Sequence, residues 1–365
     1  MHLAQPRQRM TLLALILLLL TACSGESRDF HEYADERPGI VRVSSLTVPD
    51  TPWYDGWHGF ADRLAALQGH GLSVELFVTG QLGSEETVLS ALRRNRVQLG
   101  GFSLHGLSTL VPELSLLLAP YLFESEAQAD FVIDRYLNDI YRELLAQRGI
   151  ELLAWSEVGW NHVYATRPVY APQDLHRMAM RTSNAEATRL FSEALGARPI
   201  NITFADLHTA LQTGMVNSGQ SGIGMYLMTG ISQEAPHLLL TGHAYDTGLT
   251  VANGQWWQSL SDAQRQSIRR ALGSQDDGRQ AIRSHLARLQ REASSLPNIT
   301  VSEPTPAQLE SWRELGRSTH PAIIAGAGPH GEEIYRLIMR ANQEWQTHAG
   351  GNDGAPRYQG NVDPS

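Results

Sequence analysis

Strand and helix patterns alternate along the first part of the chain, and this alternation restricts the possible fold more than any other feature. Three short strand patterns are separated by two helical patterns, at residues 41–48, 59–67, 72–78, 84–95 and 97–102. Ser84, followed by two glutamates, begins the second helix as an N-cap, and residues 49–56 resemble a turn-rich loop. This order predicts a parallel sheet covered by helices, and therefore an α/β fold.

A second α/β unit follows. A helix at 125–148 leads into a strand at 151–155, and the next strands and helices are expected at 178–182, 185–195, 199–202 and 203–212. The chain returns to the first unit near Val251, and a long polar helix is expected at 261–293, followed by helices within 305–347. Several chain crossings between two units make a hinge, and the cleft between the units is the expected ligand site.

These patterns predict six segments. They are a signal peptide at 1–22, a polar tether at 23–39, a first lobe at 40–158 with about 248–257, a second lobe at 159–247, helices packing on both lobes at 258–347, and a disordered tail at 348–365.

The N-terminus is typical of a bacterial lipoprotein signal. Arg7 and Arg9 precede an apolar run at 12–20, which is too short to span a bilayer and ends in Leu-Thr-Ala before Cys23. This resembles a lipobox, in which the cysteine carries the lipid. We therefore expect a periplasmic protein anchored to a membrane through Cys23, and Ser24 does not decide which membrane. The alternative is an ordinary signal peptide in which the cysteine is incidental.

Composition excludes several classes of function. The formal net charge of −9 disfavours nucleic acid as a partner. All 29 basic residues are arginine, which excludes a Schiff-base lysine and a lysine-bearing phosphate loop. The single cysteine excludes an internal disulfide and a cysteine-bound metal in the folded body. The 14 histidines show no metal-binding spacing, so we expect no metal and no cofactor.

Two segments resemble known motifs but do not indicate the function of those motifs. Residues 326–331 match the dinucleotide pattern G-x-G-x-x-G, but too little chain follows to complete such a fold, so we interpret them as a loop between helices. Residues 219–222 approach a nucleophile elbow without matching it. A hydrolase is therefore a poorly supported alternative, and we expect no catalytic residues.

Arg181 is the strongest candidate for a ligand contact. It ends a short apolar strand that runs toward the expected cleft. A guanidinium group stays charged, so its burial requires an anion, and its planar fork suits a carboxylate. The alternative is a surface arginine paired with a nearby acid such as Glu186.

The residues around Arg181 resemble a known signature. In order, they read Met180-Arg-Thr-Ser, Glu193-Ala-Leu-Gly-Ala, Pro199-Ile-Asn-Ile-Thr-Phe-Ala-Asp and Ala210-Leu-Gln-Thr-Gly-Met-Val. The set is similar to the substrate-binding proteins of tripartite ATP-independent periplasmic (TRAP) transporters, the DctP-like family. Gly80-Gln-Leu-Gly, Pro120-Tyr-Leu-Phe and Thr241-Gly-His agree in order and spacing, and the similarity covers roughly residues 40–345.

The resemblance implies a two-lobed, type II-like periplasmic binding protein with a long domain-spanning helix and an inter-lobe cleft. Such a protein is not an enzyme; it captures a small organic acid and delivers it to the membrane subunits of the transporter. The family arginine that binds the ligand carboxylate falls on Arg181, and the family pocket aromatic falls on Phe204.

This sequence departs from the family at several ligand positions. Asn161 stands where many members have a second arginine, Ser221 replaces an asparagine, and Ser103 occupies a position that is often acidic. The other candidate ligand contacts are Trp160, Tyr245, Thr47 and Ser84. Because these changes remove charge and add aromatic surface, we expect one anchored carboxylate and an uncharged or aromatic remainder.

A periplasmic sensor or scaffold with the same lobes remains an alternative. Neighbouring genes for membrane subunits would favour transport, whereas a neighbouring histidine kinase would favour sensing. No coiled-coil heptad is present in the long helix, so we expect a monomer.

Overall fold

The computed structural model describes residues 39–349. The expected signal segment, the tether with Cys23 and the C-terminal tail lie outside the described residues. A single sheet of nine strands runs through the described part, in the order β2-β1-β3-β8-β4-β7-β5-β6, with β9 pairing with β8. Its strands are β1 (Ile40–Ser44), β2 (Ser73–Phe77), β3 (Leu99–Ser103), β4 (Ile150–Ala165), β5 (Ala179–Thr182), β6 (Arg198–Asn201), β7 (Ser218–Gly222), β8 (His237–Asn253) and β9 (Thr300–Ser302).

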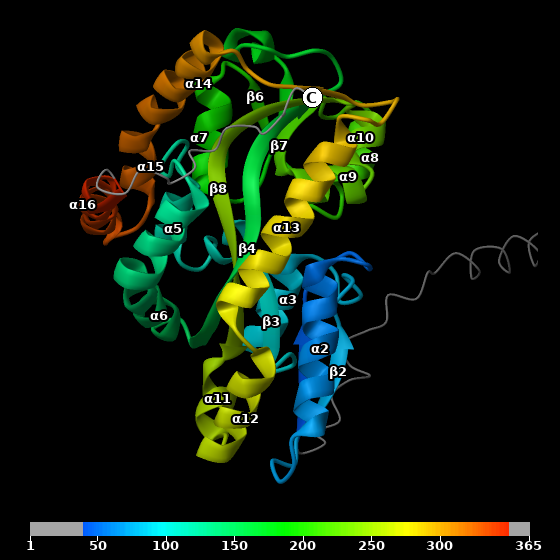
Figure 1. The fold of residues 1–365 in the computed structure, drawn as a ribbon, viewed down its shortest axis with the longest axis vertical. Helices are drawn as coiled ribbons and strands as arrows, with labels where there is room; N and C mark the ends of the chain where they lie inside the picture. The colour runs from blue at the N-terminus through cyan, green and yellow to red at the C-terminus, as the bar shows by residue number, and fades with distance from the viewer. Residues whose placement is uncertain (1–38, 350–365) are drawn as a thin grey trace, which may run out of the picture. The chain divides into compact units, whose positions relative to one another are not determined.

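Helices cover this sheet (Figure 1). The α-helices are α2 (Pro52–Ala66), α3 (Glu85–Arg93), α4 (Leu104–Leu107), α5 (Glu126–Val132), α6 (Asn138–Ala146), α7 (Glu186–Ala194), α8 (Leu207–Gln212), α9 (Ile223–Met228), α10 (Ile231–Glu234), α11 (Gly254–Ser259), α12 (Asp262–Leu272), α13 (Gln275–Ala293), α14 (Pro306–Ser318), α15 (His320–Gly326) and α16 (Gly331–Ala349). The 3₁₀ helices are η2 (Pro112–Leu118) and η4 (Pro172–Leu175), and the π-turn η3 (Ile133–Leu137) joins α5 to α6.

Two groups of parallel strands form the two lobes. In the first lobe β1 lies between β2 and β3, parallel to both, and its core includes Val41 and Val43 packed against Phe60 of α2. In the second lobe β5 lies parallel to β6 and β7. The parallel arrangement expected from the alternating patterns is therefore confirmed within each lobe, and the α/β, two-lobed fold is the observed one.

The lobes are joined by two long antiparallel strands, β4 and β8, which run side by side through both (Figure 1). The pairing of β4 with β8 shifts register between Glu157 and Gly159 and again between Asn161 and Val163. Such irregularities bend a strand pair. Gly159 has a φ of +99°, and a Cβ at this position would lie 2.5 Å from the Leu286 side chain of α13. The bend therefore requires glycine here.

Two helix predictions are wrong at their boundaries. Helix α2 begins inside the expected loop, because Thr51 caps it by accepting a hydrogen bond from the Tyr54 N–H and Pro52 suits a first turn. The expected helix at 261–293 is two helices, α12 and α13. Gly273 between them has a φ of +83°, and Ser274 caps the new helix by accepting from the Asp277 N–H. The domain-spanning helix is α13 alone, which packs on α2 of the first lobe and on α9 of the second.

Candidate functional site

A cleft of about 850 Å³ lies between the lobes, at the carboxyl ends of their parallel strands. In α/β sheets ligands bind at this edge, where loops and helix starts present polar groups. Six of the residues proposed from the sequence line the cleft: Thr47, Ser103, Asn161, Arg181, Phe204 and Ser221.

Arg181 lies at the end of β5 and is 8% exposed. Its Nε donates a hydrogen bond to the Ile202 carbonyl oxygen (3.0 Å), and its guanidinium carbon lies 5.8 Å from the centre of the Phe204 ring. None of the ion pairs within residues 39–349 involves Arg181. Glu186, the partner considered from the sequence, instead pairs with Arg189.

Burial lowers the pKa of Arg181, although Tyr164, Glu85 and Glu86 favour its charged form. An arginine remains protonated in proteins despite such shifts. The cleft therefore contains a buried positive charge that no described carboxylate neutralises, and its free Nη atoms can donate two parallel hydrogen bonds to a carboxylate.

Asn161 and Ser221 complete the second-lobe wall. They lie on the neighbouring strands β4 and β7, where Asn161 pairs with Gly222 and His162 pairs with Ser221. Both are nearly buried, Asn161 at 3% and Ser221 at 8% exposure, and both line the cleft. Asn161 stands where the resemblance predicts an arginine, and Ser221 stands where it predicts an asparagine, so both side chains are shorter than the expected ones and neither is charged.

Three proposed ligand contacts do not line the cleft. Ser84 caps α3, where its hydroxyl accepts a hydrogen bond from the Thr87 N–H. The Trp160 and Tyr245 rings pack on each other with centres 5.0 Å apart, and Arg283 of α13 donates to the Tyr245 hydroxyl (2.9 Å). Tyr245 thereby contacts α13, and Trp160, which lies opposite it in the β4–β8 pair, packs on the Tyr245 ring.

Acidic residues that the sequence reasoning missed also line the cleft, among them Glu85 and Asp246. Glu85 accepts hydrogen bonds from the Ser103 N–H (2.7 Å) and the Ser103 hydroxyl (2.6 Å). Burial raises the pKa of Glu85, and these hydrogen bonds lower it in part. In the sequence Glu85 resembles an ordinary acid in a helix first turn, so nothing there distinguishes it.

His105 connects Asp246 of β8 to Ser183, which follows β5. Its Nε2 lies 3.0 Å from Asp246 Oδ2, and its Nδ1 lies 2.8 Å from Ser183 Oγ. The order of these three groups resembles a catalytic triad, but Ser183 Oγ already accepts the Ala185 N–H (3.2 Å) and is not among the residues that line the cleft. The group holds a turn in place rather than presenting a nucleophile.

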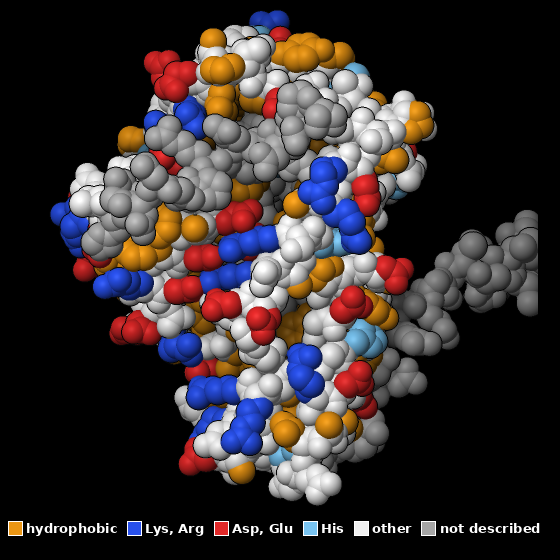
Figure 2. All heavy atoms as spheres, in the orientation of Figure 1, with side chains coloured by type: hydrophobic (Ala, Val, Ile, Leu, Met, Phe, Trp, Pro, Cys, Tyr) orange, Lys and Arg blue, Asp and Glu red, His pale blue; other side chains and the backbone are white. Residues whose placement is uncertain are grey.

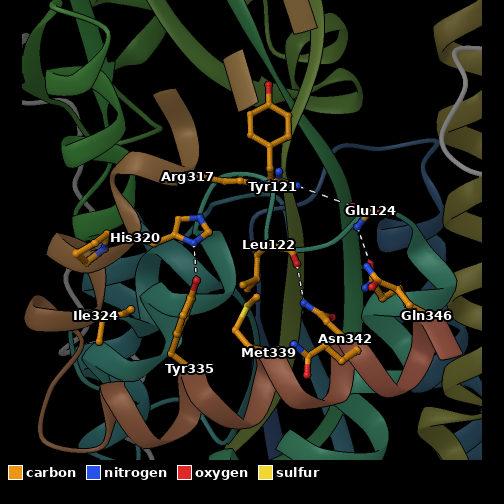
Figure 3. A pocket seen from close by; sticks show the side chains of 13 residues that line it. Tyr121, Leu122, Glu124, Arg317, His320, Ile324, Tyr335, Met339, Asn342 and Gln346 are labelled. Atoms are coloured by element: carbon orange, nitrogen blue, oxygen red, sulfur yellow. Dashed lines mark hydrogen bonds and ion pairs between the residues drawn. The ribbon is translucent and has the colours of Figure 1, made fainter. Parts of the chain in front are cut away.

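A second, smaller cavity of about 480 Å³ lies between the C-terminal helices and the loop after η2 (Figure 3). Figure 3 shows His320 and Tyr335 pointing toward one another, and their hydrogen bond is 2.7 Å long. Asn342 donates to the Leu122 carbonyl oxygen (2.9 Å), and the one arginine in the lining, Arg317, faces Glu124 at 3.8 Å. This cavity therefore lacks the unneutralised cation of the inter-lobe cleft.

Two kinds of site receive no support from the described residues. Between residues 39 and 349 no group of three acidic, histidine or cysteine side chains is placed to hold a metal ion. In the same part of the chain no helix has the length and apolar composition needed to cross a bilayer.

Comparison with known proteins agrees with this geometry. A family model described as bacterial extracellular solute-binding protein, family 7 (DctP), matches residues 43–326. The chain belongs to this family. The resemblance found around Arg181 is thereby confirmed, and the DctP family is one of solute-binding proteins.

Individual relatives are more distant. The 2,3-diketo-L-gulonate-binding periplasmic protein YiaO of Escherichia coli is 29% identical over 210 residues, which are 57% of this chain and 64% of that protein. The C4-dicarboxylate-binding periplasmic protein DctP of Rhodobacter capsulatus is 24% identical over 293 residues, 80% of this chain and 88% of that protein. The crystal structure of the sugar acid binding protein DctPAm of Advenella mimigardefordensis with galactonate has a TM-score of 0.78 at 23% identity, covering 83% of this chain and 99% of the other.

Proposed function

We propose that this protein captures a small organic acid in the cleft between its lobes and delivers it to the membrane subunits of a TRAP-type transporter, without catalysing a reaction. The buried, unpaired Arg181 is the observation that supports this proposal most strongly. Membership of the DctP family and relatives named for binding 2,3-diketo-L-gulonate and C4-dicarboxylates support the same class of ligand.

In the proposed complex the ligand carboxylate binds the Arg181 guanidinium group, and the Phe204 ring supports that group from one side. Asn161 and Ser221 contact the ligand from the second lobe, and Thr47 and Ser103 contact it from the first. Because contacts from both lobes form only when the lobes approach, the ligand favours the closed form by its higher affinity for it.

The test is a thermal-shift screen of organic acids, followed by calorimetry with the best binder. We expect Arg181→Ala to weaken binding at least tenfold, about 1.4 kcal/mol. Arg181→Lys should also bind poorly, because the planar fork is lost. Arg189→Ala, which removes an exposed arginine from α7 in the same lobe, is the matched control and should bind normally. Unchanged affinity in Arg181→Ala would remove this residue from the site.

We further propose that the protein works in the periplasm as a monomer and is held at a membrane by a lipid on Cys23. The support for the anchor is the position of Cys23, which follows the apolar run after Thr21 and Ala22. Cys23→Ser should move the protein from the membrane fraction to the soluble fraction of cells, and continued membrane association would contradict the anchor.

A further inference from the structure

The first-lobe wall of the cleft displays hydrogen-bond acceptors. The Thr47 hydroxyl donates its hydrogen to the Val78 carbonyl oxygen (2.6 Å), and the Ser45 hydroxyl donates to the Gly101 carbonyl oxygen (3.2 Å). The Ser103 hydroxyl donates to Glu85. A hydroxyl group has one hydrogen, so these three groups can offer a ligand only their oxygen lone pairs.

Two carboxylates add to this acceptor surface. Each oxygen of Glu85 accepts one hydrogen bond from Ser103 and keeps a second lone pair. Asp246 is 2% exposed and lines the cleft; its Oδ2 faces His105, whereas its Oδ1 has no hydrogen-bond partner among the described residues. A buried carboxylate oxygen without a donor is costly, so this oxygen indicates that the ligand supplies one.

Among the described arginines that line the cleft, only Arg181 is both buried and without an acidic partner. Arg279 forms a two-pronged pair with Asp134, at 2.5 and 2.9 Å. Arg63 is exposed, and its Nε donates to the Ala271 carbonyl oxygen (2.7 Å) at the end of α12. A second carboxylate of a ligand held beside Glu85 or Asp246 would therefore meet negative charge without a second buried, unpaired arginine to neutralise it.

Two indole N–H groups in the aromatic lining are already used as donors. The Trp53 indole N–H donates to the Glu157 carbonyl oxygen (2.7 Å), and the Trp155 indole N–H donates to Asn138 Oδ1 (3.2 Å). Phe204 lies beside Arg181. Aromatic rings of this kind pack against the C–H surfaces of a carbon chain or ring.

We propose that the ligand is a polyhydroxylated monocarboxylate, an acid of the sugar-acid class, and that the site rejects dicarboxylates. Its carboxylate binds Arg181, and its hydroxyl groups donate to Glu85, to Asp246 and to the lone pairs of Ser45 and Thr47. This inference rests on the proposed capture of an organic acid and specifies the chemistry of the remainder of that acid.

The experiment compares classes of acid on the whole protein by calorimetry. The probes are gluconate and galactonate as polyhydroxylated monocarboxylates, succinate as a dicarboxylate, benzoate as an apolar monocarboxylate and glycine betaine as a zwitterion. We expect the better sugar acid to bind at least tenfold more tightly than each of the other three probes. Equal or tighter binding of any of these three would overturn the inference.

Two variants test the carboxylates themselves. Glu85→Gln and Asp246→Asn each remove a negative charge and place an amide donor in the cleft, so each should reduce the ratio of sugar-acid to succinate affinity at least fivefold. Glu86→Gln makes the same charge change at the next residue, whose carboxylate binds Asn184 and does not line the cleft, and should leave the ratio unchanged. The melting temperature of each variant shows whether it is folded. Because the two carboxylates lie on different elements, the second variant still tests the inference if the first does not fold.

The outcomes separate this inference from the proposed function. If succinate binds as well as the sugar acids and neither variant changes the ratio, the assignment of ligand class fails, while acid capture stands. If no acid binds the wild-type protein, acid capture fails as well.

Discussion

Two buried regions of this protein contain arginines in opposite surroundings. In the cleft, Arg181 is 8% exposed and has no described acidic partner. On α13, Arg283 lies within 3.2 Å of three carboxylates, those of Glu126, Asp130 and Glu157. Figure 2 shows acidic and basic side chains alternating between α5 and α13, where this cluster lies.

The pKa values of the two arginines follow their surroundings. Burial lowers the pKa of Arg181. Burial also lowers the pKa of Arg283, but Asp130, Tyr245 and Glu157 outweigh it, so that this pKa is raised. An arginine neutralised by protein acids holds elements together, whereas an unneutralised arginine is free for a ligand. The comparison therefore predicts that one arginine contributes to stability and the other to binding.

The largest expected effect is the loss of Arg283. Glu157 is 1% exposed, and Arg283 Nε lies 2.7 Å from its carboxylate. Arg283→Met should lower the free energy of unfolding by about 3 kcal/mol at pH 8, because a buried charge loses its partner. Denaturant unfolding measures the loss. The double variant Arg283→Met/Glu157→Gln should recover most of it, since glutamine needs no cation; no recovery would show that the pair is not the cause.

The next effect concerns Glu157 and pH. Burial raises the pKa of Glu157 to about 7, although Arg283 lowers it in part. At pH values between the ordinary glutamate pKa of about 4.3 and this raised pKa, Glu157 binds its proton more tightly in the folded protein than in the unfolded chain. The free energy of unfolding should therefore fall as the pH rises through this window.

We expect this fall to be about 2 kcal/mol between pH 5.5 and 8, and Glu157→Gln should remove it. Unfolding curves of both proteins at several pH values measure the difference. Glu75→Gln serves as the control, because Glu75 is a partly exposed carboxylate paired with Arg42 in the first lobe. The same pH dependence in wild type and Glu157→Gln would place the titrating group elsewhere.

The same comparison explains what the sequence could predict. The strands and helices of each lobe follow from hydrophobic period and capping residues, and Arg181 stands out as a charge at the end of an apolar strand. These signals are local. The break at Gly273 is also local, but a glycine inside a helical pattern does not reveal its φ.

Contacts between distant residues could not be predicted. Glu85 and Asp246 enter the cleft from α3 and β8, and Arg283 meets Glu157 from 126 positions away along the chain. Tyr245 was predicted to contact the ligand, but it lies in the continuous strand β8, and its hydroxyl group accepts a hydrogen bond from Arg283. The face of such a strand depends on its register with β4, which includes three irregularities.

The smallest expected effect is on the stability of the Arg181 variant, and its sign separates the two regions most sharply. Without an acid, Arg181→Met should raise the free energy of unfolding by about 1 kcal/mol, because a buried cation without an anion disfavours the folded state. With a bound acid at 100 times its dissociation constant, the wild type gains about 2.7 kcal/mol that the variant lacks. The order of the two melting temperatures should therefore reverse when the acid is added. Arg189→Met, which removes an exposed ion pair on α7, should show no such reversal. A variant of Arg181 that is less stable than the wild type without ligand would assign this arginine a structural role like that of Arg283.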